Sequence, residues 1–195
     1  IKDKLKKEEI GIEKKLNILE KAVKRMIILS LGSNLSSSFG DRFENIDLAI
    51  KYLLNKQIKL IKRSSFYETP SYPNKKDPKF INAVIEVESK LKPEILAGFL
   101  LDAESSLERI RNVKNQPRTC DIDIIDYNGK NLSFDHKNCS FVVPHIRLGE
   151  RNFVLYPLKE IIPNWVHPIS NVHIDTLIKN LRNEDKNSIL KIKKS

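Results

Sequence analysis

Cysteine is scarce in this chain of 195 residues, which has only Cys120 and Cys139, and the two form no Cys-x-x-Cys pair. We therefore expect neither a disulfide framework nor a zinc site. Reduced thiols are typical of proteins in reducing compartments, so the cysteines predict a cytoplasmic location.

Motifs that mark several common enzyme classes are also missing. The six glycines form neither the Walker A loop Gly-x-x-x-x-Gly-Lys-Ser/Thr nor the Gly-x-Gly-x-x-Gly fingerprint of dinucleotide-binding proteins. The four histidines lack the spacing of a zinc protease, and no serine lies in a Gly-x-Ser-x-Gly elbow. These absences disfavour P-loop, Rossmann, zinc-protease and α/β-hydrolase chemistry.

Long apolar runs are absent as well. No run approaches the roughly 18 residues of a membrane span, so we expect no membrane partner. Residues 1–25 hold one Arg and five acidic residues and no apolar core, which is unlike a signal peptide or a mitochondrial presequence.

Charge is present in excess of one sign, with a formal net charge of +10. Much of that excess lies in residues 1–25 and 184–195, so the body of the chain is only mildly basic. Such a body suits a phosphate-bearing small substrate as well as a nucleic acid. An RNA-recognition module needs an aromatic-rich central strand, which the sequence does not offer, so we expect no nucleic-acid partner.

Apolar periodicity divides the chain into three parts. Residues 1–25 predict an amphipathic helix, 26–183 a single domain, and 184–195 a basic, solvated tail. Met26 is the only methionine, so one hypothesis is that translation starts there. The alternatives are a docking helix for a partner, or a linker from a preceding domain.

The domain itself predicts a β-α-β-β-α-β order followed by a hairpin and helices. We expect strands over 26–31, 57–68, 80–88 and 121–127 and helices over 41–54 and 93–111. A turn at Asn128-Gly129 predicts a hairpin between 121–127 and 131–134, and helices near 150–160 and 174–182 follow. This order is the ferredoxin-like pattern of an α+β fold, an antiparallel sheet with helices on one face.

The densest chemistry lies in residues 109–125. Asp121 and Asp123 share one face of a strand, where two carboxylates repel each other unless a cation or proton intervenes. Such oxygen ligands suit Mg²⁺ with substrate phosphates, and Arg109, Arg111 and Arg118 suit phosphate oxygens. The alternative is an edge strand whose solvated acids pair with surface arginines.

A second cluster is aromatic and polar. Aromatic faces stack on planar heterocycles, and an asparagine offers a donor and an acceptor together. The alternative is that each aromatic belongs to the core, which we favour for Phe43 and Phe66. The cluster that could line a flat pocket comprises Tyr67, Thr69, Pro70, Tyr72, Phe80, Asn82 and Phe153.

Taken together, these motifs resemble the 6-hydroxymethyl-7,8-dihydropterin pyrophosphokinase family of folate biosynthesis. The resemblance covers about residues 26–168 and makes 26–183 a pyrophosphokinase domain. It is carried by Leu31-Gly32-Ser33-Asn34-Leu35, Ser64-Ser65-Phe66-Tyr67-Glu68-Thr69-Pro70, Phe80-Ile81-Asn82-Ala83, Glu104, Arg109-Ile110-Arg111, Pro117-Arg118-Thr119-Cys120-Asp121-Ile122-Asp123-Ile124, Val143-Pro144-His145, Arg151 and Phe153-Val154-Leu155-Tyr156-Pro157-Leu158.

The resemblance implies a reaction and a set of roles. Pyrophosphate passes from ATP to the pterin hydroxymethyl group and AMP is released, with two Mg²⁺ ions bridging the ATP phosphates and held by Asp121 and Asp123. The implied catalytic residues are Arg109, Arg111, Arg118, Asp121 and Asp123. Those implied to bind ATP are Glu104, Arg111, Arg118, Ile124, His145 and Arg151. Those implied to surround the pterin are Thr69, Pro70, Tyr72, Phe80, Asn82, Asp121 and Phe153.

The sequence departs from the family pattern at four positions. Gln116 replaces a usual Gly and Asn115 a common Trp, which affects the loop that closes over ATP. Phe80 and Ile146 each stand where Tyr is common. A non-catalytic basic binding module on the same fold is the alternative function, but the intact acidic motif argues against it. We expect a monomer, with 1–25 as a connection to an upstream folate-pathway domain or partner.

Overall fold

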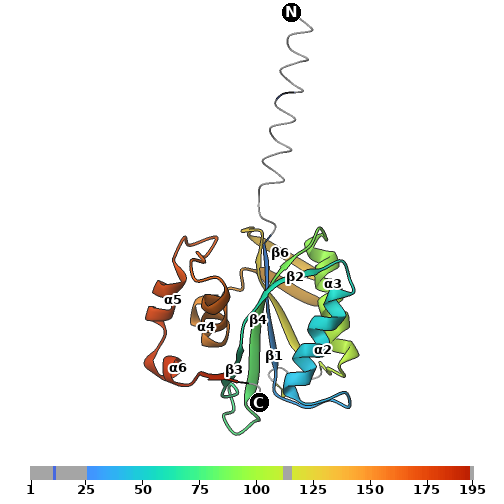
Figure 1. The fold of residues 1–195 in the computed structure, drawn as a ribbon, viewed down its shortest axis with the longest axis vertical. Helices are drawn as coiled ribbons and strands as arrows, with labels where there is room; N and C mark the ends of the chain where they lie inside the picture. Colours follow the sequence, from blue (N-terminus) through green and yellow to red (C-terminus); the bar gives the residue numbers. More distant parts are fainter. Residues whose placement is uncertain (1–10, 12–25, 112–115, 194–195) are drawn as a thin grey trace, which may run out of the picture.

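The fold is a six-stranded antiparallel sheet with helices on both faces (Figure 1). The computed structural model describes residues 11, 26–111 and 116–193. The strands of its main path run in the order β5-β1-β4-β3-β8, and β2 also pairs with β4. The predicted helix over 1–25 and Asn115 lie outside the described residues. None of the helices described is long and apolar enough to serve as a membrane span.

The elements follow the predicted order, which confirms the ferredoxin-like α+β core. The strands are β1 Ile27–Ser33, β2 Lys59–Arg63, β3 Phe66–Thr69, β4 Phe80–Glu88, β5 Asp121–Tyr127, β6 Leu132–His136, β7 Cys139–Val143 and β8 Leu190–Ile192. The helices are α2 Arg42–Leu54, α3 Pro93–Ser106, the short 3-10 helix η1 Leu148–Glu150, α4 Asn152–Ile161, α5 Ile174–Asn180 and α6 Asn183–Asn187.

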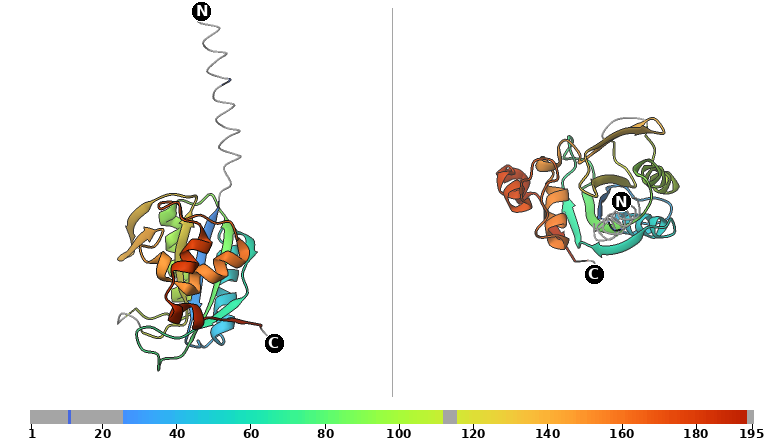
Figure 2. Two further views of the ribbon diagram at one scale, coloured as in Figure 1. Left: turned by 90° about the vertical axis from the view of Figure 1, so that its left-hand side faces the viewer. Right: turned by 90° about the horizontal axis from the view of Figure 1, so that it is seen from above.

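The sheet separates two apolar layers (Figures 1 and 2). Helices α2 and α3 cover one face, where Leu29, Ile85 and Leu100 belong to the larger core cluster. Helix α4 covers the other face with α5 against it, and Ile28 and Ile125 belong to this second cluster. The expectation of helices on one face only is therefore wrong, because the chain after β7 adds a second helical layer. Because neighbouring residues of a strand point to opposite faces, β1 contributes to both layers and is buried throughout.

Helix α2 begins where the sequence supplies a complete cap. The Asp41 carboxylate accepts hydrogen bonds from the backbone N–H groups of Phe43 and Glu44, and Glu44 accepts from the N–H of Asp41. This reciprocal arrangement satisfies amides that a helix end otherwise leaves unpaired. Gly40 is required before it, because a Cβ there would lie 2.5 Å from Glu44 Oε2.

The single strand predicted over 57–68 is wrong, because the chain breaks it in two. Ser64 accepts a hydrogen bond from the N–H of Val84 at 2.9 Å and donates its hydroxyl to the carbonyl of Ser65 at 2.8 Å. Strands β2 and β3 lie on either side of this break, and both pair with β4.

The predicted hairpin between 121–127 and 131–134 is also wrong. Strand β6 pairs with β7, and the turn between them is formed by Lys137 and Asn138, whose φ angles are 47° and 61°. Asn128 and Gly129 do turn the chain, with φ of 55° and 69°, but they only lead from β5 to β6. The Asn-Gly signal therefore marked a turn and not a strand pairing.

Two ends differ from prediction. Helix α3 stops at Ser106 instead of 111, since Glu108 adopts a φ of 64° and its carboxylate accepts hydrogen bonds from Ser38. The solvated tail predicted after 184 instead contains the helix α6 and the strand β8, which pairs with β3. Both differences affect the candidate site, because residues 109–111 leave the helix and the chain end joins the sheet.

Trp165 provides a test of how the loop after α4 is held. Its indole N–H donates to Asp126 Oδ2 at 3.0 Å and the side chain is 2% exposed. Replacing Trp165→Phe leaves that carboxylate oxygen without its donor, so we expect the free energy of unfolding to fall by about 1–3 kcal/mol. Urea denaturation measures this.

The neighbouring exposed Val166→Ala is the control, with an expected change within about 0.5 kcal/mol. Equal stability of the Trp165→Phe variant and the unaltered chain would contradict a role for this hydrogen bond.

Candidate functional site

Two carboxylates on β5 form the centre of the candidate site. Asp121 and Asp123 are partly buried and alternate with Ile122 and Ile124, which are buried in the α2–α3 core. The predicted alternation along this strand is therefore confirmed. Asp121 and Asp123 lie on the α4 side of the sheet, because Ile125 of the same alternation packs in the second cluster.

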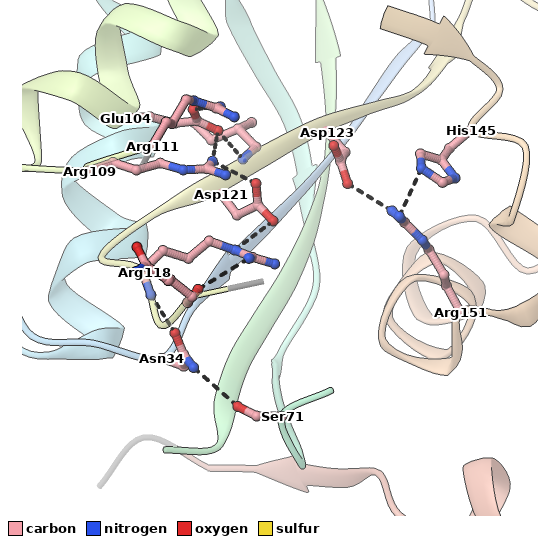
Figure 3. A network of polar contacts seen from close by, with 12 residues as sticks. Asn34, Ser71, Glu104, Arg109, Arg111, Arg118, Asp121, Asp123, His145 and Arg151 are labelled. Atoms are coloured by element: carbon pink, nitrogen blue, oxygen red, sulfur yellow. Dashed lines mark hydrogen bonds and ion pairs between the residues drawn. The ribbon is translucent and has the colours of Figure 1, made fainter. Parts of the chain in front are cut away.

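Asp121 is held by two arginines (Figure 3). Its Oδ1 accepts from Arg109 Nη1 at 2.6 Å, and Arg118 Nε lies 2.9 Å from Oδ2. Burial would raise the pKa of Asp121, but the guanidinium groups of Arg118 and Arg109 outweigh it and lower that pKa below its ordinary value. Asp121 is thus ionised across the neutral pH range.

Asp123 has a different environment. Its Oδ2 accepts from Arg151 Nη1 at 2.8 Å, and Arg151 Nη2 lies 2.8 Å from His145 Nε2. Burial and the neighbouring Asp121 raise the pKa of Asp123 above its ordinary value, although Arg151 opposes them. Burial, followed by Arg151, lowers the pKa of His145, so the imidazole is neutral beside this arginine.

Glu104 lies behind the arginines instead of at the surface. Only 2% of it is exposed, and its carboxylate accepts from the backbone N–H of Ile122 at 2.7 Å. It also accepts from Arg109 Nη1 at 2.5 Å and from Arg111 Nη2 (Figure 3). Burial raises the pKa of Glu104 to about 7, while Arg109 acts to lower it. Glu104 therefore fixes the arginines and the start of β5 together.

Asn34 is a site residue to which the sequence analysis assigned no role. It is 2% exposed, and its Oδ1 accepts from the backbone N–H of Arg118 at 2.7 Å. Its Nδ2 donates to Ser71 Oγ at 3.1 Å and to the carbonyl of Pro78 at 3.0 Å (Figure 3). One amide thus joins the arginine turn to the loop over 71–79. The sequence contains the motif Gly32-Ser33-Asn34, but no local pattern indicates the partners of Asn34, which lie far along the chain.

The aromatic and polar cluster divides into several environments. Asn82 is buried and donates to Thr69 Oγ1 at 3.0 Å, while Phe80 lies under the Arg118 guanidinium, 5.0 Å from ring centroid to Cζ. Phe153 lies 5.5 Å from Arg151 Cζ in the same way. Two of the three arginines that pair with the aspartates, Arg118 and Arg151, thus also cover the two aromatic rings, which brings both predicted clusters into one site.

The remaining predicted residues lie further from this centre. Tyr72 is 73% exposed in the loop over 71–79, next to Pro70 and Ser71 at the end of β3. Tyr67 donates its hydroxyl to Glu160 Oε2 at 2.7 Å. Phe43 and Phe66 pack edge to face at 5.1 Å in the core, as expected. Residues 112–115 of the loop predicted to close over ATP, near 112–117, lie outside the described residues.

The chain is similar in sequence to known proteins. Residues 28–163 match the family model for 7,8-dihydro-6-hydroxymethylpterin-pyrophosphokinase (HPPK). A 2-amino-4-hydroxy-6-hydroxymethyldihydropteridine pyrophosphokinase of Methylorubrum extorquens is 34% identical over 139 residues, 71% of this chain and 83% of that protein. The "Folic acid synthesis protein FOL1" of Dictyostelium discoideum is 37% identical over 159 residues, 81% of this chain but only 23% of that protein.

Solved structures agree in fold. An HPPK-DHPS of Plasmodium falciparum, crystallised with pterin and p-hydroxybenzoate, superposes with a TM-score of 0.63 at 14% identity. The match covers 86% of this chain and 47% of that one. This chain thus spans about half the length of that protein and about a quarter of the Dictyostelium one.

Glu104 provides the test of this site's electrostatics. Its pKa is raised from 4.5 to about 7, so between these values the folded state holds a proton that the unfolded state has lost. The stability that Glu104 contributes is therefore present at low pH and lost as pH rises toward 7. We expect the free energy of unfolding of wild type to fall by roughly 1–3 kcal/mol relative to that of Glu104→Gln between pH 5 and pH 8.

Urea denaturation of both proteins at the two pH values measures this difference. The exposed Glu94→Gln in the same helix is the matched control, and we expect its difference from wild type to stay within about 0.5 kcal/mol. A wild-type stability that stays constant or rises relative to that of Glu104→Gln between pH 5 and pH 8 would contradict the raised pKa.

Proposed function

Since this chain belongs to the 7,8-dihydro-6-hydroxymethylpterin-pyrophosphokinase family of folate biosynthesis, we propose that it transfers the pyrophosphoryl group of ATP to the hydroxymethyl oxygen of 6-hydroxymethyl-7,8-dihydropterin and releases AMP. The observation that carries the proposal is the convergence at β5 of two carboxylates, four arginines and two arginine-covered aromatic rings. A phosphate-rich nucleotide and a flat heterocycle are the two ligands that such a site suits.

The donor set fits Mg²⁺, and we propose two ions with ATP. Among the described residues no three His, Cys, Asp or Glu side chains gather into a metal-binding group. Two carboxylates remain, and Mg²⁺ binds proteins through one or two carboxylates together with substrate phosphates and water. Asp121 and Asp123 would hold it. When bound, Mg²⁺ offsets the negative charge of the transferred group.

The arginines have two roles in this proposal. Before substrates bind, Arg109, Arg118 and Arg151 balance the two carboxylates. With Mg²⁺ held by the carboxylates, the same guanidinium groups would be available to phosphate oxygens, with Arg111 and His145 beside them. No protein nucleophile is needed, because the substrate hydroxyl attacks directly and positioning supplies much of the rate.

The pterin pocket that we propose lies between Phe80 and Phe153. Asn82 provides a buried amide two residues from Phe80 on β4, and Thr69 fixes that amide by accepting its Nδ2 hydrogen bond. Gly32 keeps this wall open, since a Cβ there would lie 3.3 Å from Asn82 Oδ1 and 3.6 Å from Phe80. Pro70 and Tyr72 complete the side formed by the loop over 71–79.

The alternative function is a non-catalytic basic binding module on this fold, which the intact acidic motif disfavours. We further propose a cytoplasmic monomer without a nucleic-acid partner, and two free cysteines support the reducing location. We also propose that residues 1–25 connect to an upstream folate-pathway domain or partner; the name of a Pisum sativum relative, "Folate synthesis bifunctional protein, mitochondrial", supports a linked second activity.

The first test of this function is the pterin-dependent formation of AMP from ATP. Asp121→Asn and Asp123→Asn each remove a charge that holds the cation, so we expect kcat to fall at least about 100-fold. Chromatography of the nucleotide products measures this, with the unfolding midpoint recorded for each variant. Asp135→Asn on the distant β6–β7 hairpin is the control and should stay within about 2-fold.

Two results would sink the proposal. Wild-type rates in both aspartate variants would remove the carboxylates from the mechanism. Formation of ADP instead of AMP would mean that a single phosphoryl group is transferred.

The pterin pocket has its own test at Phe80. Phe80→Ala removes a stacking face, so we expect the KM for the pterin to rise about 3–10-fold with little change in the KM for ATP. Phe80→Tyr keeps the face and should stay within about 2-fold. Steady-state kinetics with each substrate varied separately measures both; equal pterin KM values for the two variants would contradict the stacking role.

A further inference from the structure

Residues 183–192 contact α4, β3 and the loop over 71–79, which flank the candidate site. We call residues 183–192, which comprise α6 and β8, the C-terminal clasp. They follow the part of the chain that matches the family model, which ends at residue 163. In Figure 1 the clasp runs beneath α4 and ends beside β3, so it connects the two layers that flank the pterin side.

The first contact holds the beginning of α4. Asn152 is buried, and its Nδ2 donates to the carbonyl of Asp185 at 2.6 Å and to Ser188 Oγ at 3.1 Å. Arg151, at the cap position of α4, makes no side-chain hydrogen bond to the helix end. Asn152, which lies between Arg151 and Phe153 in sequence, therefore supplies the side-chain contact between this first turn and the clasp. Val154, Leu155 and Leu158 pack α4 into the second core cluster.

The other contacts are with β3, with the last turn of α4 and with the loop over 71–79. Strand β8 pairs with β3, Tyr67 opposite Lys191, and β3 ends at Thr69. Lys191 also lies 3.3 Å from Glu160 Oε1 in the last turn of α4, and Lys75 of the loop over 71–79 forms an ion pair with Glu184. One short segment thus contacts both walls between which a flat ring would lie.

We propose that Asn152 and the C-terminal clasp position the pterin side of the site, a role that rests on the proposed function. The clasp adds a second connection between β3 and the first turn of α4, which carries Phe153, beside the direct hydrogen bond from Tyr67 to Glu160 of α4. Arg109, Arg118 and Asp121 are held by Glu104 and Asn34 instead, and Arg151 is independently held by Asp123 and His145. Loss of the clasp contact should therefore affect the pterin more than ATP.

The experiment uses the full chain with Asn152→Ala, which removes both hydrogen bonds to the clasp. We expect the KM for 6-hydroxymethyl-7,8-dihydropterin to rise about 5-fold or more, and the KM for ATP to stay within about 2-fold. Arg182→Ala is the matched control, since it removes an exposed ion pair with the Asp185 side chain and leaves the Asn152 contacts intact. Ser188→Ala removes one of the two acceptors of Asn152, together with the hydrogen bond that the Ser188 hydroxyl donates to the Asp185 carbonyl at 3.1 Å, and should give a smaller rise.

Each outcome decides the proposal. A selective rise in the pterin KM supports it, and Ser188→Ala carries the test if Asn152→Ala fails to fold. Unchanged KM values, or a uniform loss of activity with a lower unfolding midpoint and unchanged KM values, overturn it in favour of a merely structural role. If wild type forms no AMP, the proposed function fails separately. Amide exchange then tests the clasp: faster exchange confined to residues 152–156 and 66–69 of Asn152→Ala supports it, and unchanged exchange overturns it.

Discussion

Two like charges on neighbouring positions of one strand face are the constraint on which this structure depends. Asp121 and Asp123 cannot both remain ionised in a partly buried setting unless cations lie close to them. The chain supplies these cations as guanidinium groups from three different places. Arg109 follows α3, Arg118 precedes β5 and Arg151 precedes α4.

This arrangement makes the site a product of the assembled fold. Each arginine is fixed by something other than the aspartate it meets: Glu104 holds Arg109, Asn34 holds the backbone of Arg118, and His145 contacts Arg151. A fixed guanidinium loses little entropy when it meets an anion, which favours exchange of a carboxylate for a phosphate. Burying the Glu104 carboxylate costs free energy, but Arg109 and Arg111 pair with it. Removal of Glu104 would leave these two guanidinium groups without their carboxylate partner.

The sequence predicted those parts that local patterns determine. Alternation placed Asp121 and Asp123 on one face, and the order of elements identified the fold. The end of α3 was missed because Leu107 to Arg111 contain no helix breaker, and the helix ends through a tertiary contact between Glu108 and Ser38. The role of Asn34 was missed for the same reason, since its partners lie far along the chain. The β6–β7 hairpin was misplaced because Lys137 and Asn138 carry a weaker turn signal than Asn128-Gly129.

The place of β1 in the sheet also governs how the chain can assemble. Leu31 is paired with Ala83 on one side and with Ile122 on the other, so its two neighbours come from distant parts of the sequence. Closing such long loops costs entropy before any contact repays it, which gives the domain a high contact order and slows its folding. During synthesis, β1 cannot complete its pairing until β5 has left the ribosome. The strand that carries Asp121 and Asp123 is therefore also the one that completes the sheet around β1.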